Sequence, residues 1–234
     1  MPFADFQALY KQKLTTADEA VKVIKSGDWV DYGFCAIHPR VLDEALARRA
    51  PELEDVKVRG GISLWKPAIF DIEDPVHHII FNSHHMSSVE RHHIASGAGF
   101  HEPMRYSELP RYYYDHITPP DVAMFQVTPM DSHGYFSLAL NGSYIDAMLE
   151  KTKRIYLEVN DRQPRALCGS LIHISQVDAL VEYHHDLPVL PPVLVAPVTF
   201  IMRPASVRAL LASAGVLPTT LGTVLGAFGF STPR

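Results

Sequence analysis

The residue types best suited to chemistry gather in the loop at residues 129–137, with the sequence PMDSHGYFS. It offers a carboxylate, an imidazole, a phenol and serine hydroxyls, together with a glycine that lets backbone come close to a ligand. The candidate pocket residues here are Asp131, Ser132, His133, Gly134, Tyr135 and Ser137. They could line a ligand pocket, with the Ser137 hydroxyl donating a hydrogen bond. Alternatively the loop is a plain turn, in which Asp131 binds its own backbone and Gly134 takes a positive φ.

A second candidate lies at residues 33–39, GFCAIHP, where a strand is predicted to end and a helix to begin. The first N–H groups of a helix, at the positive end of its dipole, can bind a carboxylate or a phosphate. The candidate pocket residues here are Gly33, Phe34, Ala36 and Pro39. The alternative is simple chain reversal. No activating base is identified for Cys35, so we predict a small, buried apolar side chain there and not a nucleophile.

Paired histidines invite a metal-site interpretation. The pairs are His77-His78, His84-His85 and His92-His93. Adjacent residues on a strand or a helix point in different directions, and none of the usual zinc spacings is present in the sequence. We therefore predict no metal site and assign the histidines to surface or supporting positions. The tyrosines at 112–114 cannot all face inward on a helix, so at least one is expected at a surface or subunit contact.

The elements around the first loop predict a parallel sheet. Val122–Val127 is a nearly continuous apolar run, typical of a strand buried on both faces. Cap residues at 141–143 precede apolar positions at helical spacing, and Arg154–Val159 is a second strand. Strand, helix and strand form a βαβ crossover, which implies parallel strands. The loop at 129–137 then lies at the carboxyl end of a strand, where open α/β sheets bind ligands.

Upstream, residues 16–62 alternate helix and strand. Thr16 is a natural N-cap, with Glu19 placed for a capping box, and Gly27 ends this helix. Strands are predicted at 28–34 and 56–62, with a helix that begins at Pro39 between them and a Glu44–Arg48 pair on its surface. Further along we predict strands at 77–80 and 170–174. Helices are predicted at 3–14, 87–95, 107–114 and 175–183.

Composition sets broad limits. The chain has 234 residues and a net charge of −5, which allows one large or two small domains. It has no basic block, so nucleic acid is a poor partner. No signal-peptide layout or long charge-free apolar span is found, so we expect a cytoplasmic protein that makes no membrane contact. The two cysteines, Cys35 and Cys168, form no disulfide framework.

Five segments in order carry a resemblance to a known family. They are TADEAVKVIKSGDWV from Thr16, the helix opened by His38-Pro39, PMDSHGYFSL from Pro129, YLEVN from Tyr156 and HISQVDALVE from His173. Together they resemble the acetyl-CoA hydrolase/transferase family over about residues 10–192. Within the family, the 4-hydroxybutyrate and butyrate:acetate CoA-transferases are most similar. The resemblance implies a three-layer α/β domain, with a mostly parallel sheet flanked by helices. Both candidate loops would line an acyl-CoA pocket, and His84, His85 and Met86 would approach it.

The family's transfer reaction runs through a glutamate of a second domain, in a context that this sequence lacks. Glu158 matches the strand-end glutamate of the family, so a structural role is predicted for it and no catalytic residue is assigned. The resemblance implies the N-terminal half of an enzyme that moves CoA between a short-chain acyl-CoA and a carboxylate such as acetate. Coenzyme A thioester would be a substrate, with no permanently bound cofactor. The alternatives are an acyl-CoA hydrolase and a catalytically inactive, truncated product.

The predicted domain organisation follows from the same resemblance. Residues 1–186 form the α/β domain, residues 187–192 a proline-rich linker, and residues 193–234 an atypical tail without Asp or Glu. We interpret the tail as a truncated or disrupted start of the second domain, with at most one helix near 205–214. A compact diverged domain and a membrane-associating segment are the alternatives, although Arg203, Pro204 and Arg208 interrupt any span. The partner would be a complementary C-terminal half or a second copy of the chain.

Overall fold

The described part of the chain is organised around one parallel sheet. The computed structural model describes residues 5–115, 117–166 and 170–189, so the predictions for residues 193–234 lie outside it. Seven parallel strands follow the order β4-β3-β2-β1-β5-β7-β9. They are β1 Trp29–Phe34, β2 Val56–Gly61, β3 Ile79–Ser83, β4 Gly99–His101, β5 Val122–Val127, β7 Arg154–Val159 and β9 Ala179–Glu182. A small antiparallel pair, β6 Tyr135–Ser137 and β8 Leu171–His173, lies beside it.

The strand order creates a switch point in the middle of the sheet. The chain starts at β1, moves outward through β2, β3 and β4, and then returns to the other side of β1 with β5. Loops that leave the carboxyl ends of β1 and β5 therefore run in opposite directions. In open α/β sheets the crevice between such loops is the usual ligand site.

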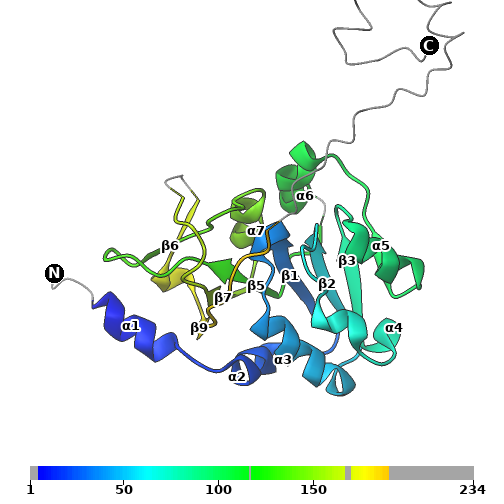
Figure 1. The fold of residues 1–234 in the computed structure, drawn as a ribbon, viewed down its shortest axis with the longest axis horizontal. Coiled ribbons are helices and arrows are strands. Elements are labelled where there is room, and N and C mark those ends of the chain that lie inside the picture. Colours follow the sequence, from blue (N-terminus) through cyan, green and yellow to red (C-terminus); the bar gives the residue numbers. More distant parts are fainter. Residues whose placement is uncertain (1–4, 116, 167–169, 190–234) are drawn as a thin grey trace, which may run out of the picture. The chain divides into compact units, whose positions relative to one another are not determined.

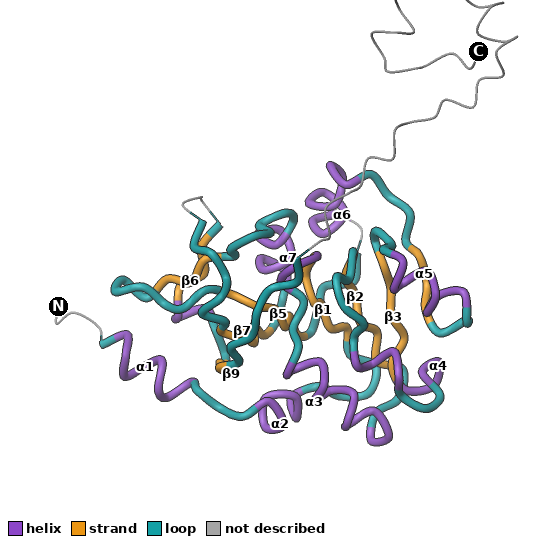
Figure 2. The backbone as a smooth tube through the Cα atoms, in the orientation of Figure 1, coloured by secondary structure: helices purple, strands orange, loops and turns teal. Residues whose placement is uncertain are grey.

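Helices cover both faces of the sheet, as Figures 1 and 2 show. They are α1 Phe6–Lys13, α2 Ala17–Ala20, α3 Val41–Arg49, α4 Pro75–His78, α5 Ser88–Ala95, α6 Leu109–Asp115 and α7 Ile145–Lys151. Strand β5 shows the layering in its side chains. Val122 and Met124 join the apolar cluster under α2 and α3, whereas Ala123 and Phe125 join the cluster under α6 and α7. This alternation confirms the predicted three-layer α/β fold with a strand buried on both faces.

Local signals placed several helices correctly. Ser87 with Glu90 forms a full capping box at α5. At α2 the Thr16 hydroxyl accepts a hydrogen bond from the Glu19 N–H, but the Glu19 side chain binds Lys22 and does not complete the predicted box. Helix α2 also ends at Ala20 and continues as a 3₁₀ turn to Val23, short of the predicted end at Gly27. Helix α3, however, begins at Val41 and not at Pro39, after a short 3₁₀ turn Cys35–Ile37. The predicted Glu44–Arg48 pair is replaced by an ion pair between Arg48 and Asp18 on α2. The predicted strand at 77–80 is the end of α4 followed by β3.

The predicted helix at 175–183 is wrong. Residues Ile174–Gln176 form one 3₁₀ turn, and Ala179–Glu182 is the edge strand β9. The apolar spacing in this segment fits either structure, and pairing with β7 decides it. Asp178 contributes, because its carboxylate accepts a hydrogen bond from the Ile155 N–H of β7 at 2.8 Å.

Helix α1 is attached to this edge strand. The Tyr10 hydroxyl donates to the Glu182 carboxylate at 2.7 Å, and the Lys13 ammonium donates to the Ile174 carbonyl at 2.9 Å. The Thr15 N–H also donates to the Leu180 carbonyl at 2.9 Å. The beginning of the described chain therefore fastens its last strand. Among the described residues, no helix combines the length and the apolar character needed to cross a membrane.

Candidate functional site

The turn after β1 is the most constrained part of the carboxyl edge. Gly33 has a φ of 70°, and a Cβ there would lie 3.0 Å from side-chain atoms of both Ile37 and Ile145. Cys35 also has a positive φ, 61°, which is uncommon for a residue with a side chain. The Gly33 carbonyl accepts a hydrogen bond from the Tyr144 hydroxyl at 2.9 Å, and the Phe34 carbonyl accepts one from the Asn141 amide at the same distance. The segment after β6 is thus tied to the end of β1.

Further unusual backbone occurs around the same edge. Ile62, after β2, has a φ of 51°, and Ala139 and Ser143, after β6, have φ values of 53° and 36°. A β-branched residue such as Ile62 is particularly disfavoured in this region. Backbone strain of this kind persists only where the surroundings enforce it, and it is concentrated at functional sites. This observation marks the carboxyl edge as the candidate site.

Burial divides the predicted residues of the first junction. Gly33, Phe34, Ala36 and Pro39 are all buried, whereas Cys35 is half-buried. Burial raises the pKa of the Cys35 thiol, in agreement with the predicted non-nucleophilic role. Two buried glutamine side chains also bind the backbone of this junction. The Gln126 amide donates to the His38 carbonyl at 2.7 Å, and the Gln163 amide donates to the Ala36 carbonyl at 3.1 Å.

The first N–H groups of α3 already have a hydrogen-bond acceptor. The Glu158 carboxylate, at the end of β7, is fully buried and accepts hydrogen bonds from the backbone N–H groups of Arg40, Val41 and Leu42. Burial raises its pKa to about 8, although the three N–H groups act in the opposite direction. The expected structural role of Glu158 is confirmed. The prediction that these helix N–H groups are free for a ligand is therefore wrong.

In the loop after β5, the turn interpretation accounts for Asp131 and Gly134. The Asp131 carboxylate accepts hydrogen bonds from the His133 and Tyr135 N–H groups, both at 2.9 Å, and Gly134 has a φ of 84°. Arg165 forms an ion pair with the same carboxylate. Burial alone would raise the pKa of Asp131, but the two N–H groups and Arg165 outweigh it and hold this pKa below its ordinary value.

The other residues of the loop separate into buried and exposed groups. Ser137 is fully buried and its hydroxyl donates to the Ala166 carbonyl at 3.3 Å, so this donor is occupied inside the protein. Ser132, His133 and Tyr135 are exposed. Within the described chain, no hydrogen bond joins these three side chains to residues 33–39. The two candidate segments meet instead through a shared apolar cluster that includes Phe34, Ile37 and Phe136.

A buried hydrogen-bonded network beside β1 was not predicted. Asp31, fully buried on β1, accepts hydrogen bonds from the Gly33 N–H at 2.8 Å and from the Tyr113 hydroxyl at 2.5 Å. His84 continues the chain, with its Nε2 3.2 Å from the Tyr113 oxygen and its Nδ1 3.2 Å from a Glu102 oxygen. Burial raises the pKa of Asp31, against the opposing effects of Arg59, Tyr113 and His84. The available signal was a charged residue inside the apolar strand WVDYGF.

The histidines and tyrosines considered in the sequence analysis differ in burial and in their contacts. His85 packs against Phe34 with ring centroids 6.5 Å apart, which places His85 beside the end of β1. Burial lowers the pKa of His38 to about 4, which keeps this ring neutral. Tyr113 is buried, whereas Tyr114 is 43% exposed, as the sequence requires of at least one tyrosine. No group of three metal-ligating side chains occurs among the described residues.

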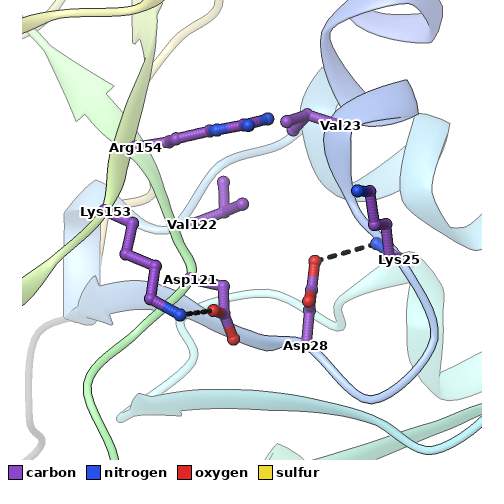
Figure 3. Close-up of a pocket in the computed structure, with 7 residues that line it drawn as sticks. All are labelled: Val23, Lys25, Asp28, Asp121, Val122, Lys153 and Arg154. Atoms are coloured by element: carbon purple, nitrogen blue, oxygen red, sulfur yellow. Dashed lines mark hydrogen bonds and ion pairs between the residues drawn. The ribbon is translucent and has the colours of Figure 1, made fainter.

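The opposite edge of the sheet has a different character. A cavity of about 150 Å³ lies at the amino ends of β1, β5 and β7, and Figure 3 shows the side chains that line it. Its two carboxylates already have partners, since Asp121 pairs with Lys153 and the Asp28 carboxylate accepts a hydrogen bond from the backbone N–H of Lys25 at 2.8 Å. The cavity therefore offers no free carboxylate to a ligand.

The fold and the candidate site define the class of protein: a parallel α/β domain with constrained loops at the switch point of its sheet. The family described as "Acetyl-CoA hydrolase/transferase N-terminal domain" matches residues 3–191. The chain belongs to this family.

Similar proteins agree with this assignment. The chain is 50% identical over 179 residues to the butyryl-CoA:acetate CoA-transferase of Anaerostipes caccae, which covers 76% of this chain and 40% of that protein. It is 29% identical over 188 residues to the 4-hydroxybutyrate coenzyme A transferase of Clostridium kluyveri, covering 80% of this chain and 44% of that protein. The crystal structure of RipA from Yersinia pestis is similar with a TM-score of 0.72 and 35% identity, over 80% of this chain and 46% of that one. The chain thus spans less than half the length of these relatives.

Proposed function

We propose that this chain forms one wall of an acyl-CoA site and takes part in the transfer of CoA between a short-chain acyl-CoA and a carboxylate such as acetate. The observation that carries the proposal is the constrained backbone at the switch point of a fold whose similar proteins are CoA-transferases by name. Coenzyme A thioester would be a substrate and no resident cofactor is needed. The partner would be a complementary C-terminal half or a second copy of the chain.

The candidate residues divide into two roles in this proposal. Asp131, Ser132, His133 and Tyr135 belong to the loop that faces the acyl-CoA, and Asp131 holds that loop in its turn. The buried residues shape the wall from behind and set the course of its backbone. They are Gly33, Phe34, Ala36, Pro39, Gly134 and Ser137.

The proposed wall contributes no nucleophilic carboxylate. Covalent transfer through a carboxylate requires an oxygen that can reach the thioester carbon. Among the described residues at this edge, Asp31 and Glu158 are fully buried and hydrogen-bonded, and Asp131 is engaged in its turn. The other carboxylates of the edge also have partners: Glu102 lies beside His84, Asp161 beside His184, and Glu182 accepts a hydrogen bond from the Tyr10 hydroxyl. We therefore propose that the reacting carboxylate is supplied from outside residues 5–189.

A product assay tests the proposal. The purified 234-residue chain is incubated with butyryl-CoA, with and without acetate, while butyryl-CoA, acetyl-CoA and free CoA are separated and quantified. Acetate-dependent acetyl-CoA indicates transfer, and free CoA without acetate indicates the hydrolase that the family description also includes. The expected result for this chain alone is butyryl-CoA binding with little turnover.

Variants locate the wall. His133→Ala is expected to weaken butyryl-CoA binding severalfold, whereas His77→Ala, an exposed histidine of α4, serves as the matched control and should have no effect. If wild-type protein fails to bind butyryl-CoA at all, the proposed function is wrong. Rapid turnover by the chain alone would contradict the claim about the missing carboxylate.

A further inference from the structure

Arg40, at the start of α3, has a guanidinium group that packs against an aromatic ring but has no anionic partner among the described residues. Its guanidinium carbon lies 4.5 Å from the centroid of the Trp65 ring, so the indole covers one face of the group. Its Nε is buried and has no hydrogen-bond partner. Among the described residues, the Arg40 side chain forms no hydrogen bond or ion pair. Arg40 is partly buried, and an arginine whose buried Nε has no partner is a candidate receptor for an anion.

The nearest buried acid does not neutralise Arg40. The Glu158 carboxylate binds the backbone N–H of Arg40, not its side chain, and its Oε2 also accepts hydrogen bonds from the N–H groups of Val41 and Leu42. Burial also raises the pKa of Glu158 to about 8, so its proton is retained at neutral pH. The charge of the guanidinium therefore remains available.

His185, after β9, presents a second unused group beside the same indole. Its ring centroid lies 6.3 Å from that of Trp65, and its Nε2 lies 3.9 Å from a Glu158 oxygen. The Nδ1–H donates to the Asp186 carbonyl at 3.0 Å, which leaves the buried Nε2 without a hydrogen-bond partner. Burial, together with the positive charge of Arg40, lowers the pKa of His185. An anion near both groups would favour protonation of Nε2, which would then donate a second hydrogen bond.

We propose that Arg40, Trp65 and His185 form an oxyanion-binding site at the carboxyl edge of the sheet. The site would bind a carboxylate or a phosphate of the CoA-transfer substrates, so this inference rests on the proposed function. A guanidinium with its face covered offers the N–H groups at its edge, which match the two oxygens of a carboxylate or phosphate. The indole fixes the direction of that edge and excludes water from one side.

The substrate class has two sources of such an anion, and they can be separated. The free carboxylate is probed with butyrate, and the CoA phosphates with coenzyme A, each titrated into the 234-residue chain by calorimetry and by tryptophan fluorescence. Trp65 reports the site directly, because an anion bound to Arg40 alters the charge next to the indole. A Trp65→Phe variant should lose this fluorescence change, since Trp29 lies on β1 and stacks on Arg59.

Arg40→Gln is the decisive variant, because the cap of α3 uses the backbone of residue 40 and survives the substitution. Loss of a charge-assisted, desolvated contact should weaken binding of one probe by about tenfold to a hundredfold. Arg40→Lys keeps the positive charge but not the paired N–H groups of the guanidinium, so the loss of affinity should be intermediate. Arg162→Gln is the matched control, since Arg162 is exposed and lies near Asp161 and Asp186. Its affinity should equal that of wild type, and thermal melting checks that all variants fold.

The outcomes are distinct. A loss confined to butyrate assigns the site to the free carboxylate, and a loss confined to coenzyme A assigns it to the phosphates. Wild-type affinity of Arg40→Gln for both probes overturns the site but leaves the proposed function intact. If neither probe binds to wild-type protein, both the site and the proposed function are wrong.

Discussion

The two edges of the same sheet handle polarity and backbone strain in opposite ways. At the amino edge, positive φ angles outside glycine occur at Asp55 and Asp74, residues that tolerate this conformation. Ion pairs there, Lys57–Asp55 and Lys153–Asp121, are partly exposed to solvent. At the carboxyl edge positive φ angles occur at Cys35, Ile62, Ala139 and Ser143, which tolerate this conformation poorly. Two carboxylates there are fully buried and bonded to backbone N–H groups: Glu158 binds the start of α3, and Asp31 binds the Gly33 N–H. The amino edge is therefore largely solvated, whereas the backbone of the carboxyl edge is held in a fixed geometry, as a binding site requires.

Removing the buried carboxylate should have the largest effect. Glu158→Ala leaves three buried N–H groups of α3 without an acceptor, and we expect a loss of about 3 kcal/mol in the free energy of unfolding. The matched change at the amino edge is Asp121→Ala, which frees the partly exposed Trp29 N–H and Lys153 and should cost about 1 kcal/mol. Urea denaturation measures both. Equal losses would remove the distinction between the edges.

The pH dependence of stability should separate the same two acids. The pKa of Glu158 is raised to about 8 in the folded protein from an ordinary 4.5, so between these values the folded state keeps a proton that the unfolded chain releases. Its contribution to stability is present at pH 4 and is lost as the pH rises towards 8. Glu158→Gln does not titrate, so its stability relative to wild type should rise by about 2 kcal/mol between pH 5 and 7.

Asp121 provides the control for this measurement. Lys153 and the Trp29 N–H outweigh the effect of burial and lower the pKa of Asp121, so its contribution is present above its ordinary value of 3.8 and is lost only in acid. The stability difference between wild type and Asp121→Asn should therefore stay constant from pH 5 to 8. A parallel slope for the two variants would contradict the buried, protonated state of Glu158.

A pair of glycines offers a finer comparison. Gly33 and Gly27 both have a positive φ, but a Cβ at Gly33 would meet Ile37 and Ile145 at 3.0 Å, whereas nothing lies within 4 Å of one at Gly27. Gly27→Ala should cost about 1 kcal/mol for its backbone alone. Gly33→Ala should cost about 1 kcal/mol more, because Ile37 and Ile145 must shift. Thermal denaturation gives both values, and an equal loss would show that the turn after β1 adapts freely.

The smallest expected effect compares two tyrosines of α6. Tyr113→Phe removes the hydroxyl that donates to the buried Asp31, which should cost about 1 kcal/mol in unfolding free energy. Tyr114→Phe removes only an exposed contact with Glu150 and should change stability by less than about 0.5 kcal/mol. A measurable loss in Tyr114→Phe equal to that of Tyr113→Phe would show that burial of the network contributes nothing.

Short-range patterns predicted the parts of the fold that depend on neighbours in sequence. The apolar run of β5 and the caps at Thr16 and Ser87 were predicted because a few adjacent residues specify them. Strand β9 was missed because its apolar spacing also fits a helix, and only pairing with β7 selects the strand. Glu158 was placed at a strand end, but its partner is the start of α3, 118 residues earlier, which no local pattern reveals.

In the candidate site, too, the sequence predicted local features but not contacts between distant segments. Both loops were located from their residue types, since the carboxyl ends of parallel strands are identifiable in a βαβ pattern. Which residues face outward could not be predicted, because Ser137 and Ala36 are buried by segments distant in sequence. The Asp31 network likewise joins β1 to Tyr113, 82 positions away.

The attachment of α1 to β9 has a consequence for the order of folding. Tyr10 is synthesised 172 residues before its partner Glu182. Helix α1 therefore cannot make this contact until the strands on both sides of β1 have been synthesised. Contacts between such distant segments form slowly, and until they form the backbone of the edge strand is uncovered and able to pair with another chain. Residues 5–15 therefore cover the edge strand only late in folding, and their removal should show itself first as aggregation during synthesis.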